Sequence, residues 1–309
     1  MTEPIRVLRK SQFFHPDGFP IVVTRRDPQE PFGLHAHEFW EIVIITGGKG
    51  RHVTGVDSYE LSAGDAFVIG GARPHDYQDL EELRLINILF DNDELPWDLG
   101  DLSEMPGYHT LFTLEPAFRQ HHRFDSRLRL EPMDLAFAIE MIEKLEHELN
   151  ERAAGFRVQS MTLMMQLITF LARCYERCRT PRNQGLLEVA DAIAHIEINY
   201  ADVITLDQLI EISNMSRRNF LRTFETAMGD SPIQYLIRLR IRKACERLRA
   251  SEKSITEIAM DVGFSDSNYF SRKFRDIIGM SPREYKRMYR EIPLPTAGEP
   301  ETAEVSKAF

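Results

Sequence analysis

The chain has 309 residues, which is long enough for two domains that each bury a core of their own. Its hydrophobic and charged fractions, 43% and 28%, are ordinary for a soluble protein. No apolar stretch approaches the roughly 20 residues that cross a membrane, and the start at Met1 lacks the form of a signal peptide, so no membrane partner is expected. Cys174, Cys178 and Cys245 are an odd number of cysteines without metal-knuckle spacing, which predicts free thiols in a reducing cytoplasm.

The first part of the chain, residues 20–92, has the pattern of short strands broken by turns. Its β-branched and aromatic runs are Ile21–Val23, Phe39–Ile45, Ala66–Ile69 and Leu83–Phe90. Glycine-rich turns are predicted between them, at 47–50, 55–57 and 70–74. Many short strands at regular spacing predict a small β-barrel or sandwich.

Two amphipathic helices are predicted to follow, at Pro132–Asn150 and Val158–Cys178. Their apolar residues at helical spacing are Leu135, Ile139, Ile142, Leu145 and Leu149, then Met161, Met164, Met165, Ile168, Leu171 and Tyr175. Such a stripe favours either a core within the chain or a homodimer interface, and both alternatives stay open. A polar linker is predicted at 179–185, a helical segment at 186–290 and a disordered tail at 291–309.

The helical segment contains an internal duplication with an offset of 50 positions. Phe220, Arg222, Phe224, Gly229, Ser231, Pro232 and Tyr235 recur as Phe270, Arg272, Phe274, Gly279, Ser281, Pro282 and Tyr285. Capping signals predict helix starts near 232, 255 and 282, and the two glycines are suited to left-handed helix ends. Each copy therefore predicts a short helix, a tight turn and a second helix: 206–213 with 216–228, and 255–262 with 265–278.

This helix-turn-helix arrangement places its second helix in the major groove of DNA. The 18 residues of Ile233–Ala250 would form a rod of roughly 27 Å between the copies, close to the roughly 34 Å between successive major grooves. The outward candidates for DNA contact are Arg217, Arg218, Arg222, Asp266, Ser267, Asn268, Arg272 and Lys273. Arginine can bond guanine, asparagine adenine and aspartate cytosine, while a phosphate contact or a solvated side chain is the alternative at each position.

The charge distribution agrees with a DNA-binding C-terminal half. Residues 181–290 have 18 Lys+Arg against 15 Asp+Glu, whereas residues 1–180 have 19 against 29 and the tail has 1 against 4. The net charge of −10 therefore comes from the first half and the tail.

Residues 186–290 resemble the DNA-binding domain of the AraC/XylS family of transcription regulators, which has two helix-turn-helix units. The resemblance is based on Ile258, Ala259, Gly263, Phe264, Asp266, Ser267, Asn268, Tyr269, Phe270, Phe274, Gly279, Ser281, Pro282 and Tyr285. It implies a cytoplasmic bacterial regulator, often an activator, that binds promoter DNA and contacts RNA polymerase. The pattern at 37–44 and 107–112 is most similar to the L-rhamnose operon regulators of that family. Their base-contacting positions imply that role here for Arg218, Arg222, Asp266 and Asn268.

The strand segment resembles a cupin barrel, through His35, His37, Glu41, Gly64, Asp65 and His75. The resemblance to metal cupins implies one divalent transition-metal ion held by His35, His37, Glu41 and His75. Cupin-like domains of regulators also hold a small effector without metal, and Gly70–Gly71 stands where cupins usually have a proline. A metal-free pocket, for example for a sugar, would use His35, His37, Glu41, His75, Tyr77 and Asn87.

We therefore predict an α+β protein with two domains. A cupin-like β-barrel with two helices, at 13–178, would bind the effector and form the dimer, and an all-α domain at 186–290 would bind DNA. The predicted function is a sequence-specific transcription regulator, an activator of carbohydrate catabolism genes, with no catalytic residues and no cofactor besides its small effector. The alternatives are a cupin metalloenzyme fused to a DNA-binding domain and a regulator that responds to a non-sugar effector.

Overall fold

The structure is a computed structural model that describes residues 5–54, 57–71, 73–92, 94–95, 100–118, 127–178 and 184–291. It divides into two compact units. The first unit consists of Met1–Ala194 with Ile210–Gly229, and the second of His195–Leu209 with Asp230–Phe309. Most of the predicted linker, 179–183, and the predicted tail from residue 292 onward lie outside the described residues.

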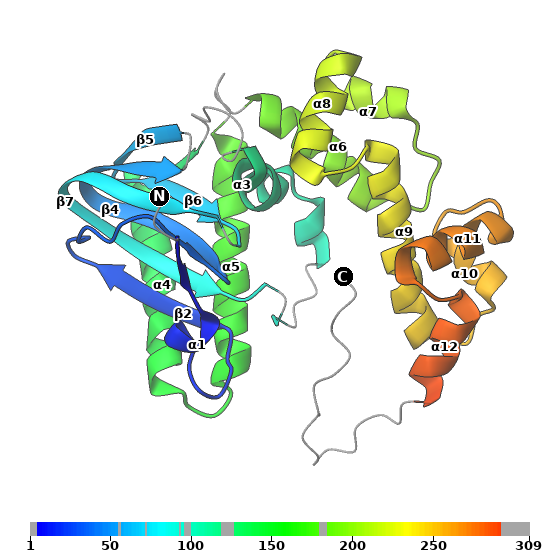
Figure 1. The fold of residues 1–309 in the computed structure, drawn as a ribbon, viewed down its shortest axis with the longest axis horizontal. Helices are drawn as coiled ribbons and strands as arrows, with labels where there is room; N and C mark the ends of the chain where they lie inside the picture. The colour runs from blue at the N-terminus through cyan, green and yellow to red at the C-terminus, as the bar shows by residue number, and fades with distance from the viewer. Residues whose placement is uncertain are drawn as a thin grey trace. The chain divides into compact units, whose positions relative to one another are not determined.

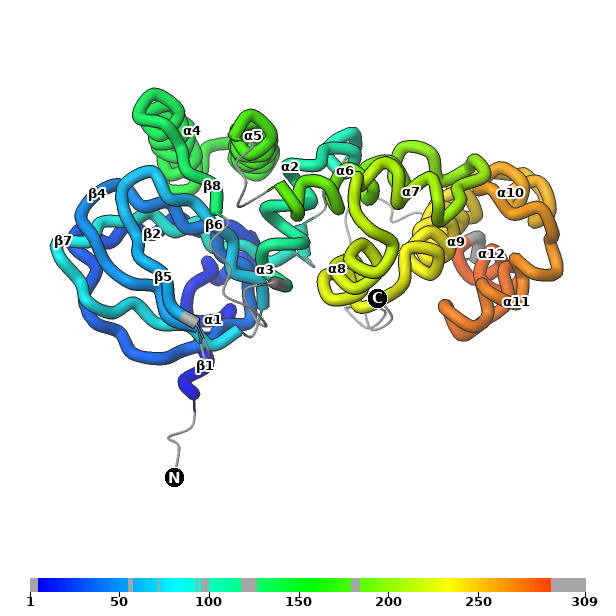
Figure 2. Tube along the Cα trace, turned by 90° about the horizontal axis from the view of Figure 1, so that it is seen from above, coloured from blue at the N-terminus to red at the C-terminus, as the bar shows by residue number. Residues whose placement is uncertain are grey.

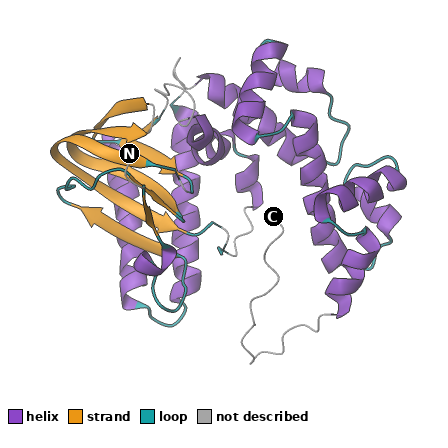
Figure 3. Cartoon of the chain, viewed as in Figure 1, coloured by secondary structure: helices purple, strands orange, loops and turns teal. Residues whose placement is uncertain are grey.

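The first unit contains an eight-stranded sheet (Figures 1 and 3). Its strands are β1 (Arg6–Leu8), β2 (Ile21–Arg26), β3 (His35–His37), β4 (Trp40–Thr54), β5 (Asp57–Ser62), β6 (Asp65–Ile69), β7 (His75–Phe90) and β8 (Leu128–Arg129). The strand order is β1-β3-β7-β4-β6-β8, while β2 pairs with β7 and β5 pairs with β4. Seen from above, the sheet curls around on itself (Figure 2), which agrees with the predicted sheet-rich first domain.

The two faces of β4 have different surroundings, because alternate side chains of a strand point to opposite faces. Ile42 and Ile44 belong to the core cluster that the sheet shares with two long helices. Val43 and Ile45 belong to a second cluster on the inner side of the curled sheet. Glu41 has the parity of the second pair, so the strand directs its carboxylate to the inner side.

β4 continues through Gly47–Gly50, where the sequence pattern predicted a turn. Its pairing with β7 shifts register three times between Ile45 and Arg51, so the glycines form bulges. Gly48 has a φ of +70°, and a Cβ atom there would collide with the backbone carbonyl of Glu82. The turn prediction was wrong because a glycine-rich run also serves a bulge that bends a long strand.

The helices of this unit that precede the predicted linker are α1 (Lys10–Phe13), η1 (Gly100–Glu104), α2 (Pro106–Tyr108), η2 (His109–Leu114), α3 (Glu115–Phe118), α4 (Pro132–Glu151) and α5 (Phe156–Arg177). α4 and α5 lie side by side on the outer face of the sheet (Figures 1 and 2). Both were predicted to within two residues at each end. Ile142, Leu145 and Ile168 of the predicted stripes are buried in the shared core, and each buried side chain of this size stabilises the contact by about 1.5–3 kcal/mol.

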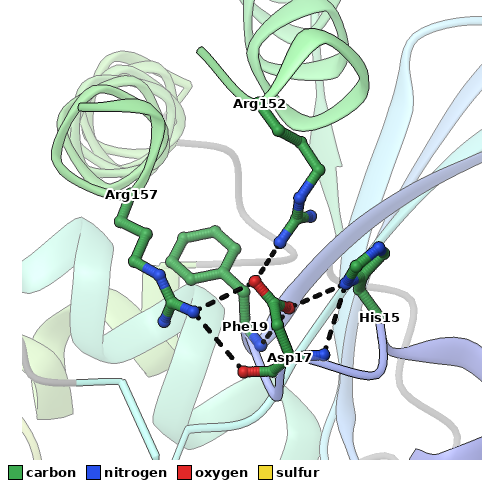
Figure 4. A network of polar contacts seen from close by, with 5 residues as sticks. All are labelled: His15, Asp17, Phe19, Arg152 and Arg157. Atoms are coloured by element: carbon green, nitrogen blue, oxygen red, sulfur yellow. Dashed lines mark hydrogen bonds and ion pairs between the residues drawn. The ribbon is translucent and has the colours of Figure 1, made fainter. Parts of the chain in front are cut away.

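A polar cluster ties the loop before β2 to the turn between α4 and α5 (Figure 4). The Asp17 carboxylate forms ion pairs with Arg152 and with Arg157, whose Nη2 lies 3.0 Å from Oδ2. Asp17 Oδ1 accepts a hydrogen bond from the Phe19 backbone N–H at 3.1 Å and lies 2.9 Å from His15 Nδ1. Burial acts to raise the pKa of Asp17, but these donors and the Arg152 charge together lower it to about 2.

The later helices are α6 (Gln184–Asn199), α7 (Leu206–Ile212), α8 (Arg217–Met228), α9 (Pro232–Ala250), α10 (Ile255–Asp261), α11 (Ser267–Ile278) and α12 (Pro282–Glu291). The predicted starts at 232, 255 and 282 are confirmed. Ser254 and Glu257 form a reciprocal capping box, and Gly229 and Gly279 end α8 and α11 with φ of 70° and 83°. Among the described residues, every helix falls short of the length and apolar character that a bilayer-spanning segment requires.

The second unit has a core at the junction of α9, α10, α11 and α12. Phe270 and Phe274 are fully buried there with Ile258 and Ala259. The Phe270 ring lies 5.6 Å from the Phe274 ring, which in turn lies 5.5 Å from the ring of Tyr285. The apolar face of α11 is therefore its anchor, and its polar face is left for solvent or a partner.

Candidate functional site

The inner side of the curled sheet contains a cavity of about 70 Å³. Its polar lining residues are Thr24, Arg26, Gln29, His35, His37, Glu41, Tyr77 and Asn87. Its apolar lining residues are Leu8, Phe13, Phe32, Phe39 and Leu89. Polar groups that converge on an apolar wall are the usual form of a small-molecule site.

Five of the six residues predicted for effector binding line this cavity, and they are His35, His37, Glu41, Tyr77 and Asn87. The sixth, His75, is buried next to them, with its Nε2 3.8 Å from Oε2 of Glu41. Asn87 is also buried, and within the described structure its Oδ1 has no hydrogen-bond partner. A buried acceptor without a partner is costly unless a ligand or water satisfies it.

Three imidazole rings of the site have the same local hydrogen bond. Nδ1 of His35 lies 2.9 Å from the carbonyl oxygen of Gly33, and Nδ1 of His37 lies 2.6 Å from that of Phe39. Nδ1 of His75 lies 3.0 Å from the carbonyl oxygen of Arg73. Because a carbonyl oxygen can only accept, each Nδ1 must be the protonated nitrogen, and in a neutral ring Nε2 then has the free lone pair.

The charge states of the site follow from its burial. Burial lowers the pKa of His75 to about 4 and also lowers the pKa of His35, because the charged imidazolium is poorly solvated there. Burial alone would raise the pKa of Glu41, but its polar contact with His37 and the nearby imidazoles more than offset this effect, so that pKa is lowered. At neutral pH the site therefore presents neutral His35 and His75 rings beside an ionised carboxylate.

The structure brings together three of the four residues that the cupin resemblance implied as metal ligands. Ligand atoms of His37, Glu41 and His75 all lie within 4.8 Å of one another. His35 is not part of that group, since its ring packs against the rings of His75 and Phe32 with centroid distances of 4.3 Å and 4.6 Å.

On the first of the two predicted recognition helices, α8, the arginines point outward. Arg217, Arg218 and Arg222 are exposed, whereas Phe220 and Phe224 on the opposite face are fully buried. Ser216 caps the helix by accepting from a backbone N–H of the first turn. The sequence order of α7, a short turn and α8 is thus the predicted one, with boundaries shifted by only one residue.

On the second predicted recognition helix, α11, the residues predicted to contact DNA differ in their exposure. Asn268 and Arg272 are exposed, while Ser267 and Lys273 are half-buried. Asp266 is the N-cap residue, and its Oδ1 accepts from the backbone N–H of Tyr269 at 2.5 Å. A carboxylate held by a cap has only its other oxygen for a base, so capping competes with the role predicted for Asp266.

Comparison with known proteins covers both halves of the chain. Residues 20–168 match the AraC-like ligand binding domain, and residues 209–288 match a helix-turn-helix domain family. The HTH-type transcriptional activator RhaR of Cronobacter sakazakii is 32% identical over 92% of this chain and 96% of its own length. The chain belongs to the AraC family of transcription regulators.

A second curated relative agrees with the assignment to the AraC family. RhaR of Klebsiella pneumoniae is 31% identical over 92% of this chain and 98% of its own length. Among solved structures, the DNA-binding domain of AdpA in complex with a target DNA is 31% identical over 33% of this chain and 93% of that domain, with a TM-score of 0.33. The family confirms the predicted DNA-binding regulator with a ligand-binding first domain, and it agrees with the prediction that the protein is not an enzyme.

Three polar residues of the cavity, Thr24, Arg26 and Gln29, were not singled out from the sequence. Thr24 and Arg26 line the cavity from β2, where Thr24 is in register with Asn87. Thr24 and Arg26 are two residues apart, so the sequence could have shown that they lie on the same face of a strand. Only the pairing of β2 with β7 shows that this face points into the cavity. On α11, Tyr269 is 37% exposed, with the guanidinium of Arg272 5.3 Å from its ring centroid, so it belongs to the polar face as well.

Proposed function

We propose that this AraC-family regulator is a transcription activator whose effector, a monosaccharide of the L-rhamnose type, binds in the cavity of the curled sheet. The observation that supports this most is the unpaired Asn87 Oδ1 beside the ionised Glu41 carboxylate. Both are acceptors on a buried wall, and sugar hydroxyls are the donors that would satisfy them. The RhaR activators to which the chain is similar are consistent with this effector class.

Titration calorimetry with L-rhamnose and with its epimers tests the effector. Asn87→Ala should weaken sugar binding at least tenfold, and Thr24→Val, which removes one hydroxyl without changing shape, should weaken it about three- to tenfold. The matched control is Thr169→Val, because that hydroxyl bonds the Met165 carbonyl on α5 away from the cavity. Equal affinities in all variants would refute the cavity as the effector site.

A second effector class has one observation in its favour. Arg26 lines the cavity, and an arginine guanidinium can bind a carboxylate through two parallel hydrogen bonds. A thermal-shift screen that includes aromatic and sugar acids therefore separates the two classes. A response to an acid that Arg26→Gln abolishes, together with no response to neutral sugars, would replace the sugar proposal by a non-sugar effector.

The homodimer is proposed to form through α4 and α5. A groove of about 920 Å³ lies along these helices, and its lining includes Phe137, Met141 and Phe170. Phe137 is 50% exposed, and the nearby ends of the helices expose Met133 and Val158 even more. Large apolar side chains on an open surface mark contact sites. Phe137→Glu should convert a dimer into a monomer in light scattering, while the exposed Glu140→Gln on the same helix should not.

Promoter DNA and RNA polymerase are the proposed macromolecular partners, in the cytoplasm. α8 and α11 would contact successive major grooves through the two outward faces described above, with the 19-residue α9 as the spacer between them. Effector binding would favour the conformation with the higher DNA or polymerase affinity by its differential affinity for the two states.

A further inference from the structure

We propose that Asn219 and Tyr269 are positioning residues, which hold Arg222 of α8 and Arg272 of α11 in the orientation that contacts base edges in DNA. The two pairs are equivalent in the internal duplication, because the second pair stands 50 positions after the first. In each pair the two side chains are three residues apart, so they are neighbours on the helix surface. The inference rests on the contact of these two helices with the major groove that is proposed above.

In α8, the orientation of Arg222 is set by a hydrogen bond. Its Nη2 donates to the side-chain Oδ1 of Asn219 at 2.9 Å. Asn219 is half-buried, and its backbone N–H in turn donates to the N-cap hydroxyl of Ser216 at 3.4 Å. The amide therefore belongs to the capped first turn of the helix, whereas the guanidinium that it holds is exposed. This bond uses one of the five N–H donors of the arginine and leaves the others for DNA.

In α11, the equivalent arginine is held by an aromatic ring instead. The guanidinium carbon of Arg272 lies 5.3 Å from the ring centroid of Tyr269, which is within the range of a cation–π contact. The Tyr269 ring also packs against the ring of Phe264, with centroids 6.0 Å apart, and Phe264 is buried in the core of the second unit. A cation–π contact uses the face of the guanidinium, so all of its N–H donors stay available at the edges.

Both arginines are held by groups without a negative charge. On α9, by contrast, Arg242 pairs with the buried carboxylate of Glu197 at 3.3 Å. A carboxylate beside Arg222 or Arg272 would compete with DNA for the guanidinium and would repel the phosphates. An amide and a ring fix the orientation of the side chain and leave its charge available to the DNA.

Orientation before binding lowers the entropic cost of the contact. Fixing a long, flexible side chain at an interface costs an amount that corresponds to about two- to tenfold in affinity. An arginine that its neighbour already holds loses less freedom when it meets a guanine. Two parallel bonds to O6 and N7 also require the planar fork to approach at a defined angle, whereas a phosphate accepts many angles. We therefore expect Asn219 and Tyr269 to act on base discrimination more than on non-specific affinity.

The test is a double-mutant cycle on each helix, made in the full-length protein. The probe is the duplex that the wild type selects from a randomised library, and competition with its single-base variants measures discrimination at each position. Asn219→Ala should reduce discrimination about two- to tenfold at the position that Arg222→Ala also affects, with no further loss in the Arg222→Ala background. Tyr269→Leu should reduce it about two- to fivefold at the position that depends on Arg272.

A conservative variant and two controls separate positioning from a structural effect. Tyr269→Phe keeps the ring and should keep wild-type discrimination, and a loss equal to that of Tyr269→Leu would overturn the cation–π pair. The controls are Thr226→Val on α8 and Ser271→Ala on α11. These hydroxyls donate to the backbone carbonyls of Arg222 and Ser267 within their own helices, so their removal should leave discrimination unchanged. Circular dichroism melts show whether each variant is folded.

The possible outcomes distinguish this inference from the function on which it rests. If Asn219→Ala and Tyr269→Leu leave discrimination unchanged while the two arginine variants reduce it, the positioning role is wrong and the recognition faces stand. Additive losses in both cycles would also overturn the positioning role, because the two residues would then act independently of the arginines. If Arg222→Ala and Arg272→Ala themselves leave discrimination unchanged, the assigned recognition faces are wrong and the inference falls with them.

Discussion

The negative charge of Asp17 should stabilise the folded state of the first unit. Asp17→Asn removes the ion pairs with Arg152 and Arg157 but retains an acceptor for the backbone. The lowering of the pKa from 3.8 to about 2 corresponds to about 2.4 kcal/mol at 1.36 kcal/mol per unit. We reduce this to about 1 kcal/mol, because the Asp17 side chain is 32% exposed and solvent screens its partners.

The contribution of Asp17 to the free energy of unfolding should depend on pH. The folded-state pKa lies below the unfolded value, so the contribution is present above about pH 4 and is lost as the pH falls through about 2. Urea unfolding followed by tryptophan fluorescence measures it, since Trp40 of β4 belongs to the first unit. Between pH 5 and pH 2.5 the wild type should progressively lose stability relative to Asp17→Asn, and the two should have equal stability only below a pH of about 2.

A suitable control is Glu140→Gln, which removes the exposed ion pair with Lys144 on α4. That pair should contribute at most about 0.5 kcal/mol with little pH dependence in this range. The prediction would be wrong if Asp17→Asn and the wild type had the same free energy of unfolding at pH 7, or if both values fell in parallel on acidification. In that case the ion pairs of Asp17 would not stabilise the contact between the loop before β2 and the two helices.

Three further predictions concern the helical half. Phe270→Ala should cost about 3–5 kcal/mol, because the ring is fully buried, and a thermal melt by circular dichroism should show the loss. Gly263→Ala should also destabilise, by about 1–3 kcal/mol, since φ is +93° and the added Cβ would press on the Ala201 carbonyl; an unchanged melt would contradict this. Arg222→Ala and Asn268→Ala should each lose roughly 1–3 kcal/mol of sequence discrimination, at different positions of the site, and unchanged footprints for both would disprove the assigned recognition faces.

Much of the helical half could be predicted because its signals are local. A serine cap bonds a backbone N–H three residues away, and a glycine stop depends on one residue's φ. The starts of α9, α10 and α12 therefore followed from short sequence windows. Asp266 shows the limit of that approach, because the same pattern that suggested a base contact is also an N-cap.

The sheet was less predictable because glycine has more than one structural use. The run at Gly47–Gly50 has the composition of a turn, but β4 continues through it, since its partner β7 is long enough to pair on both sides of the bulges. The segment at 100–118 has no clear periodicity, and its short helical turns, including the π-helical η2, could not be predicted from it.

The sequence alone determined that this protein has a DNA-binding half built on a duplicated unit, because duplication and capping are written in residue types at fixed spacing. It also pointed to five of the eight polar residues that line the cavity of the curled sheet. Only the tertiary structure decided how those residues are grouped: His35 and His37 share a strand face, yet His37 joins Glu41 and His75 while His35 packs on aromatic rings. The reason is physical, since strand periodicity gives the face of a side chain, but the pairing of β3, β4 and β7 decides which side chains meet.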